Sequence, residues 1–171
     1  MELNSIKIRI AGTVKESVVD GPGLRYVIFT QGCPHHCEGC HNQDTWDPKG
    51  GKLIGAHDLL NDIKKARLIR GVTFSGGEPF LQARALARLG REIKNWGLDV
   101  ITFTGYTWEE LLRNNDPGFK ALIEISDYLV DGPFMLAERD IGLAFRGSRN
   151  QRIIKVRDTL DVGQPVTLNY F

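Results

Sequence analysis

Three cysteines within eight positions are the residues of this 171-residue chain that are best suited to chemistry. Cys33, Cys37 and Cys40 are its only cysteines, in the spacing Cys-x3-Cys-x2-Cys. Because three thiols so close together cannot build a disulfide framework, we expect them to stay reduced and to bind a soft metal. This spacing allows three thiolates to hold one face of an iron–sulfur cubane, whereas electron-transfer clusters use four. The fourth iron is then open to another ligand, and chemistry can take place there.

Other interpretations of the cysteines stay open when the spacing alone is considered. A structural zinc site would take them together with His35, His36 or His41. Cys37-x2-Cys40-His41 also matches the attachment pattern of a c-type haem, which requires export from the cell. Buried thiols without chemistry are a third alternative, although a polar loop of Pro, His, Glu and Gly makes a poor core. The spacing favours an iron–sulfur cluster over these alternatives.

A second motif, Ser75-Gly76-Gly77-Glu78, follows a short apolar run. Glycines at the end of a strand let the backbone approach a ligand closely and present its N–H or C=O groups. The carboxylate of Glu78 suits a ligand that carries an ammonium group. A plain strand-to-helix turn is the alternative. Because the same chain carries the cysteine loop, we interpret the motif as part of a binding site.

Short β-branched runs alternate with amphipathic segments along the chain. Helices are predicted at residues 56–68, 81–96 and 107–112, and another begins at the cap Asp116-Pro117. Alternation of strands and helices predicts an α/β fold with a parallel sheet and right-handed crossovers. The strands are predicted at residues 6–10, 26–30, 71–74, 100–103, 128–130 and 152–156.

In such a sheet the functional groups lie at the carboxyl ends of the strands. Four polar or glycine-rich segments follow predicted strands directly, so we expect them to meet at one rim. They are the cysteine loop at residues 31–51, the Gly-Gly-Glu turn, Thr104-Gly105-Tyr106 and Asp131-Gly132-Pro133.

The composition argues against several functional classes. Hydrophobic residues make up 42% and charged residues 25% of the chain, and the net charge is +1. This near-neutral balance gives no reason to expect a nucleic acid or an anionic membrane as partner. No apolar run approaches the ~18 residues of a membrane span, and residues 1–11 lack the apolar stretch of a signal peptide. We therefore expect a cytoplasmic, soluble protein that folds as a single domain over residues 1–171.

Taken together, the motifs resemble the radical S-adenosylmethionine superfamily and, more narrowly, its glycyl-radical-enzyme activases. The segment Arg146-Gly-Ser-Arg-Asn-Gln-Arg152 is most similar to the activating proteins of anaerobic ribonucleoside-triphosphate reductase. The resemblance covers roughly residues 5–157 and implies an incomplete, open parallel (βα) barrel of the radical S-adenosylmethionine type. Its other motifs are Ser17-Val-Val-Asp-Gly-Pro-Gly-Leu-Arg25, Phe29-Thr-Gln-Gly-Cys33, Cys40-His-Asn42 through Trp46, Thr104-Gly-Tyr-Thr107 and Asp131-Gly-Pro-Phe134.

The resemblance implies two cofactors, a 4Fe–4S cluster and S-adenosylmethionine bound at its open iron. Flavodoxin or ferredoxin supplies an electron, and the resulting 5′-deoxyadenosyl radical takes hydrogen from a glycine of the reductase. No side chain is expected to act as a general acid or base. The implied cluster ligands are Cys33, Cys37 and Cys40. The residues implied for S-adenosylmethionine are Gly39, Cys40, His41, Ser75, Gly76, Gly77, Glu78, Thr104 and Asp131, with the glycine backbone and Glu78 at the methionine ammonium.

Two features depart from the wider superfamily. The residue before the third cysteine, often aromatic in relatives, is Gly39, which leaves open what packs against the adenine; His41 or backbone near Gly39 could substitute. No further cysteines follow the motif, which favours a minimal activase with one cluster.

Arg146, Arg149 and Asn150 are expected to contact the partner or the cofactor.

Three other functions compete with this one. They are activation of another glycyl radical enzyme such as pyruvate formate-lyase, radical synthesis on a small molecule such as a deazapurine, and zinc binding in an interaction module. Pyruvate formate-lyase activases are generally longer, so the chain length and residues 146–152 disfavour the first. Turnover of a free substrate would identify the second, and metal analysis would identify the third.

Overall fold

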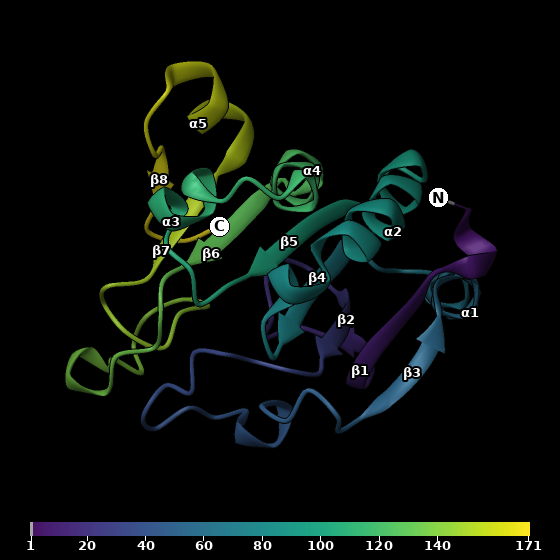
Figure 1. The fold of residues 1–171 in the computed structure, drawn as a ribbon. Coiled ribbons are helices and arrows are strands. Elements are labelled where there is room, and N and C mark those ends of the chain that lie inside the picture. The colour runs from purple at the N-terminus through teal and green to yellow at the C-terminus, as the bar shows by residue number, and fades with distance from the viewer. Residues whose placement is uncertain (1) are drawn as a thin grey trace.

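One eight-stranded sheet organises the molecule (Figure 1). The computed structural model describes residues 2–171, and the strands lie in the order β3-β1-β2-β4-β5-β6-β7-β8. The strands are β1 (Lys7–Ser17), β2 (Arg25–Thr30), β3 (Lys52–Gly55), β4 (Gly71–Gly76), β5 (Asp99–Phe103), β6 (Tyr128–Asp131), β7 (Arg152–Lys155) and β8 (Thr167–Leu168). The helices are α1 (Ala56–Lys65), α2 (Ala83–Asn95), α3 (Trp108–Arg113), α4 (Pro117–Ile125) and α5 (Val156–Val162).

The centre of the sheet is parallel and its edges are antiparallel. β2, β4, β5 and β6 pair in parallel, as predicted. β1 pairs antiparallel with β2 and β3, and β7 pairs antiparallel with β6 and β8. The predicted parallel (βα) core is therefore confirmed for four strands, whereas a parallel arrangement is wrong for the strands predicted at 6–10 and 152–156.

The connections explain this difference. A parallel pair needs a crossover connection, and α1, α2 and the pair α3–α4 supply it between the central strands. β1 reaches β2 through residues 18–24, and β6 reaches β7 through residues 132–151; neither connection contains an α-helix. The chain therefore turns back beside the strand that it has just left.

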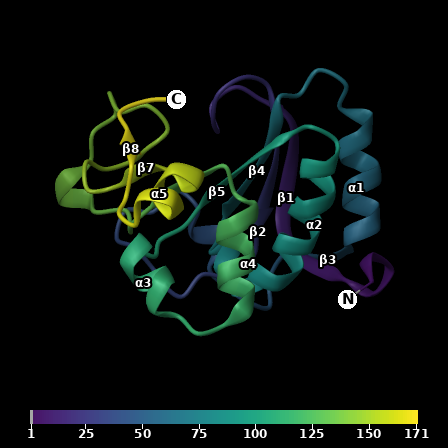
Figure 2. The same ribbon diagram turned by 90° about the horizontal axis from the view of Figure 1, so that it is seen from above.

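The main core lies between the sheet and the helices α1, α2 and α4, which lie along one face (Figure 2). Strand alternation in β4 points Val72 and Phe74 toward the helices and Thr73 to the opposite, inner face. Leu89 of α2 and Leu122 of α4 are completely buried in this core. A smaller cluster on the inner face holds Ile101, Val130 and Ile153.

The predicted helices are confirmed with small shifts at their ends. The capping box of Thr107 and Glu110 opens α3, and Asp116 caps α4 with Pro117 at its first position. α1 ends three residues earlier than predicted, because the backbone at Ala66 is extended.

α2 is shorter than the helix predicted at residues 81–96. A 3-10 turn, η3 (Pro79–Gln82), precedes the helix, which therefore starts at Ala83. Leu89 and Ile93 of α2 are buried, whereas Leu81 before the helix is 49% exposed and Trp96 after it is 37% exposed.

Three short elements are not predicted by the sequence pattern: β3, α5 and β8. β3 and β8 have only four and two residues, too few to show a period. α5 begins at Val156, which the pattern assigns to the end of a strand. Within residues 2–171 no helix is both long and apolar enough to cross a membrane.

Residues 18–24 cross the inner face of the sheet. The Thr73 hydroxyl donates to the carbonyl of Asp20 at 2.9 Å and accepts from Nε of Arg25 at 2.8 Å. Arg25 is completely buried and pairs with Asp99. The Asp20-Gly21-Pro22-Gly23 segment is thus packed against the strands and is more than an exposed tight turn.

Candidate active site

Loops at one end of the sheet line a chamber of about 150 Å³. Four of them follow β2, β4, β5 and β6, the parallel strands, whose carboxyl ends share one edge (Figure 1). The expected meeting of these four segments is confirmed. Their lining residues are Cys33, His35, Cys37, Cys40, Asn42, Thr45, Trp46, Ser75, Gly76, Gly77, Phe103, Thr104, Gly105, Val130, Gly132 and Phe134.

Backbone hydrogen bonds close the cysteine loop at its base. The N–H of Cys33 donates to the carbonyl of Trp46 at 3.1 Å, and the N–H of Gly32 donates to that of Thr45 at 2.6 Å. The side-chain amide of Gln31 donates to two further carbonyls of the returning segment. The three thiols therefore lie in a loop whose two ends are held together beside the end of β2.

The three thiols are unpaired and partly buried. Burial raises the pKa of Cys33, and the charges of Glu78 and Cys37 act in the same direction, against backbone hydrogen bonds that lower it. A metal must displace this proton to bind the thiolate. Within residues 2–171 no three Cys, His, Asp or Glu side chains converge on the position of one metal ion. Three thiolates without a fourth cysteine suit one face of a cubane, in which each thiolate binds its own iron.

The Gly-Gly turn runs close to the start of the cysteine loop. A Cβ on Gly77 would lie 2.3 Å from the carbonyl oxygen of Gly32, and Gly76 has a positive φ of 86°. The N–H of Gly77 donates to Thr30 at 2.8 Å, and that of Glu78 donates to Gly32 at 2.7 Å. Glycine is therefore required here by the approach of two backbone segments. Ser75, Gly76 and Gly77 form one wall of the chamber, and the cysteine loop forms another.

Glu78 lies behind this wall and is completely buried. Its carboxylate accepts hydrogen bonds from Nε2 of His35 at 2.7 Å, from the Thr104 hydroxyl at 2.8 Å and from the Gly105 N–H at 2.8 Å. The N–H of Phe80 donates to it at 3.0 Å. These four donors occupy both oxygens, and Glu78 is not among the residues that line the chamber. Its contact with a methionine ammonium group stays a prediction.

Asp131 also points away from the chamber. It is 1% exposed and accepts hydrogen bonds from Arg152 at 2.6 and 3.1 Å and from the N–H of Trp108 at 2.8 Å. Arg152 also binds Glu109, and its donation lowers the pKa of that carboxyl. Asp131 thus joins β6 and β7 to the start of α3, while its neighbours Val130 and Gly132 line the chamber.

Several lining residues lie beside the motifs but were not assigned a role from the sequence. His35 is expected there only as an alternative zinc ligand, whereas the structure brings it to Glu78. Phe103 and Gln151 line the chamber as well, and no pattern in the sequence marks them. Phe103 directly precedes Thr104, and Gln151 lies within residues 146–152. This nearness to the predicted site segments is the one sequence signal for them.

A second chamber of about 470 Å³ adjoins the first and shares Cys40, Asn42, Ser75, Phe103, Phe134 and Gln151 with it. His41 lines the second chamber. Its lining also includes Val19, from the segment of residues 18–24, and Ile141, Phe145 and Arg146, from the connection between β6 and β7.

Arg146, Arg149 and Asn150, which are expected to contact the partner or the cofactor, have three different surroundings. Arg146 lines the second chamber and donates to the carbonyl of Ala144 at 3.2 Å. Asn150 donates to the carbonyl of Pro133 at 2.7 Å, and Arg149 is exposed. Gly39 is close to Phe134 and Leu136, since a Cβ there would lie 3.3 and 3.0 Å from their side chains. Contacts of these residues with a cofactor or partner stay predictions.

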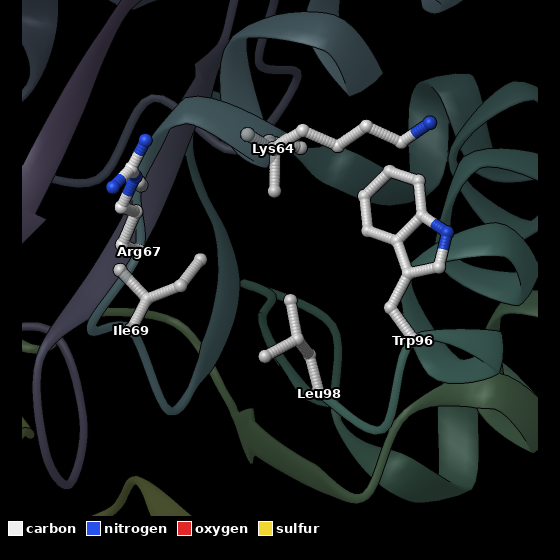
Figure 3. A pocket seen from close by; sticks show the side chains of 7 residues that line it. Lys64, Arg67, Ile69, Trp96 and Leu98 are labelled. Atoms are coloured by element: carbon white, nitrogen blue, oxygen red, sulfur yellow. The ribbon is translucent and has the colours of Figure 1, made fainter.

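A separate pocket lies at the other end of the sheet (Figure 3). Ile69 and Leu98, which line it, shortly precede β4 and β5. The ammonium of Lys64 lies 4.9 Å from the ring centroid of Trp96. Its lining residues include no Cys, His, Asp or Glu, so it offers no ligands for a metal.

Comparisons with known proteins show the family to which this chain belongs. A family model described as "4Fe-4S single cluster domain" matches residues 19–154. The anaerobic ribonucleoside-triphosphate reductase-activating protein of Vibrio cholerae is 39% identical over 144 residues, which are 80% of this chain and 90% of that protein. The protein of the same name from Escherichia coli K12 is 32% identical over 148 residues, 82% of this chain and 94% of that protein.

Two further similarities are more limited. Pyruvate formate-lyase 1-activating enzyme of Escherichia coli K12 is 38% identical over 117 residues, which are 66% of this chain but only 46% of that enzyme. The crystal structure of QueE from Escherichia coli superposes with a TM-score of 0.52 at 17% identity, over 75% of this chain and 72% of that one. The second similarity concerns the fold alone.

Proposed function

The chain belongs to the radical S-adenosylmethionine activase family with a single 4Fe–4S cluster, and from this premise we propose that its partner is anaerobic ribonucleoside-triphosphate reductase. The proposed activity is formation of a glycyl radical in that enzyme. Flavodoxin or ferredoxin is the proposed electron donor. The three free thiols require a reducing compartment, for which we propose the cytoplasm.

The residues of the chamber fit the two cofactors. Cys33, Cys37 and Cys40 would hold the cluster as thiolates, and the backbone of Ser75, Gly76 and Gly77 would receive the methionine end of S-adenosylmethionine. When bound, the two cofactors supply a 5′-deoxyadenosyl radical that can take a hydrogen atom. The protein orients these groups and keeps water out of the chamber.

The single observation that carries the proposal is the junction of two chambers. The first is lined by the three thiols and by the backbone of the Gly-Gly turn. The second opens beside it past Cys40 and Phe134 and is large enough for a short stretch of extended chain. A glycine of a partner can therefore reach the place where the radical forms without rearrangement of the sheet. Thr104 lines this chamber, and Glu78 and Asp131 support it from behind.

Electron paramagnetic resonance on the anaerobically reconstituted protein tests the proposal. We expect a reduced 4Fe–4S signal that changes shape when S-adenosylmethionine is added. Addition of the reductase should then produce a glycyl radical signal and 5′-deoxyadenosine in equal amounts.

Pyruvate formate-lyase serves as the comparison substrate in the same experiment. A glycyl radical in pyruvate formate-lyase and none in the reductase would show that the partner assignment is wrong. Zinc in place of iron after anaerobic purification would exclude the enzymatic proposal altogether.

A further inference from the structure

A hydrogen bond joins the two walls of the first chamber. Nε2 of His35 lies 2.7 Å from Oε2 of Glu78. His35 stands midway between Cys33 and Cys37, whereas Glu78 directly follows the Gly-Gly turn. We call this contact the His35–Glu78 clasp.

The Glu78 end of the clasp is held firmly. The carboxylate is completely buried and also accepts hydrogen bonds from Thr104, from Gly105 and from the backbone of Phe80. A buried acceptor with all its donors in place keeps one orientation, because any rotation would leave charged oxygens unpaired.

The His35 end is held by packing. The imidazole lies edge-on to the ring of Tyr106, with centroids 4.6 Å apart and an interplanar angle of 79°. Gly105 makes room for it, since a Cβ there would lie 2.4 Å from Cδ2 of His35. The side chain of His35 is only 16% exposed. Both partners of the clasp therefore have defined positions.

Without the clasp, the two walls are joined only at their base. The backbone bonds from Gly77 to Thr30 and from Glu78 to Gly32 both lie before Cys33. Among residues 2–171, the clasp is the one hydrogen bond between residues 34–41 and the segments that follow β4 and β5. His36, the neighbouring imidazole, stacks instead on Trp46 of the same loop, at 4.6 Å and 10°.

We infer that His35 is a positioning residue that sets the distance between the cysteine wall and the glycine wall. This inference rests on the proposed function, in which one cofactor spans both walls: the open iron on one side and the Ser75–Gly77 backbone on the other. Partners in the second shell of a metal site orient the groups that bind the metal. Here the hydrogen bond from His35 to Glu78 orients the whole cysteine loop, so Glu78 positions the loop through His35.

Three variants test the clasp on the full chain. His35→Phe keeps a ring beside Tyr106 but has no donor, and His35→Gln keeps a donor but loses the ring. His36→Phe is the matched control, because it preserves the stacking on Trp46 and does not reach Glu78. All three keep the three thiols, so we expect each to take up the wild-type amount of iron.

The readout is the affinity for S-adenosylmethionine, together with the change that it causes in the spectrum of the reduced cluster. We expect His35→Phe to weaken binding about 10- to 100-fold and to reduce the spectral change. His35→Gln should recover most of both, and His36→Phe should match the wild type. Equal affinities and spectra in His35→Phe and wild type would overturn the inference, as would equal losses in His35→Phe and His36→Phe.

Hydrogen exchange on the same chains before reconstitution separates this inference from the proposed function. We expect faster exchange of the Gly105 amide, which donates to Glu78, and of the Cys40 amide in His35→Phe only. Exchange unchanged by His35→Phe overturns the clasp even if the wild type binds both cofactors. A wild type that binds no cluster refutes the proposed function, and the exchange result still decides whether the clasp holds the loop.

Discussion

At the scale of single residues, the three cysteines have no substitute within the chain. Each is an unpaired thiol on the wall of the first chamber, and the sequence contains no fourth cysteine. Loss of one thiolate leaves an iron without a protein ligand in addition to the open one. A cluster with only two protein ligands is easily lost to solvent.

We therefore expect Cys37→Ala to abolish cluster binding. Iron content and 5′-deoxyadenosine formation should fall about 100-fold or more, measured by iron analysis and by chromatography of the products. His57→Ala is the control, because His57 is an exposed side chain on α1. Undiminished 5′-deoxyadenosine in Cys37→Ala would contradict the assignment of the ligands.

At position 77 only glycine fits, because two backbone segments approach each other closely there whether or not a cofactor is bound. The missing Cβ of Gly77 leaves room for the carbonyl of Gly32, which starts the cysteine loop. A side chain there must push the Gly-Gly turn away from the loop. The same displacement would alter the chamber, so stability and cofactor binding are linked at this position.

Gly77→Ala should lower the free energy of unfolding by about 1–3 kcal/mol, since the added methyl group overpacks a tight backbone contact. Gly12→Ala is the control, because a Cβ at Gly12 meets nothing within 4 Å; its effect should stay within about 0.5 kcal/mol. Denaturant unfolding of both variants measures the difference. Equal stabilities would show that the turn can shift at no cost.

At the scale of elements, specific polar contacts attach helices to the sheet. Tyr26 of β2 donates its hydroxyl to Asp62 of α1 at 2.6 Å. Burial, followed by the bond to Asp62, raises the pKa of Tyr26 to about 12 from 10.0. The folded protein therefore holds this proton more tightly than the unfolded chain does.

The sign of the pH dependence follows from this shift. A raised pKa in the folded state gives a contribution to stability that is complete below about pH 10 and is lost as pH rises toward 12. We expect one tyrosine to ionise near pH 12 in an ultraviolet titration, and Tyr26→Phe to remove that step. A titration in which Tyr26→Phe removes a step near pH 10 would contradict the burial argument.

A second contact between elements joins β6, β7 and α3. Asp131 is buried and its charge is balanced by Arg152, which also reaches Glu109. An Arg152→Leu variant leaves this carboxylate buried without its cation, which should cost about 2–3 kcal/mol of stability. Lys155→Leu on the same strand removes only the exposed pair with Asp158 and should lower stability much less. Thermal unfolding compares the two, and equal losses would show that Asp131 does not depend on Arg152.

At the scale of the whole molecule, the helices cover one face of the sheet and the loops build the chambers at one end. The second chamber is bordered by residues from distant parts of the chain, among them Val19 and Ile141. Ile141 is 91% exposed although it is apolar, and Val18 and Val19 are 69% and 73% exposed. In the proposed function, a partner approaches over this exposed apolar rim to bring a glycine to the first chamber.

Ile141→Asp should therefore reduce the yield of glycyl radical in the reductase about tenfold, because a charge replaces an apolar contact. Leu68→Asp is the control: Leu68 is 83% exposed and lies between two residues that line the pocket at the other end of the sheet. Electron paramagnetic resonance of the activated reductase gives the yield. An equal effect of both variants, or of neither, would place the partner elsewhere.

Local sequence patterns are sufficient to predict a metal-binding cysteine loop and the parallel strands at the centre of the sheet. The spacing of three cysteines, the Gly-Gly turn and the alternation of strands and helices are local properties, and local rules of residue type and period interpret them well. They led to the parallel core and to the end of the sheet where the site lies. The cap at Asp116 is equally local and is confirmed.

The pairing of the edge strands and the direction of the polar side chains depend on tertiary packing and do not follow from local patterns. Whether a connection crosses over or turns back depends on what packs beside it, which no residue within the connection shows. Glu78 turns to His35 and Asp131 to Arg152 because burial forces each carboxylate to find donors. Those donors lie 43 and 21 positions away, so they become neighbours only when the sheet and its loops have assembled.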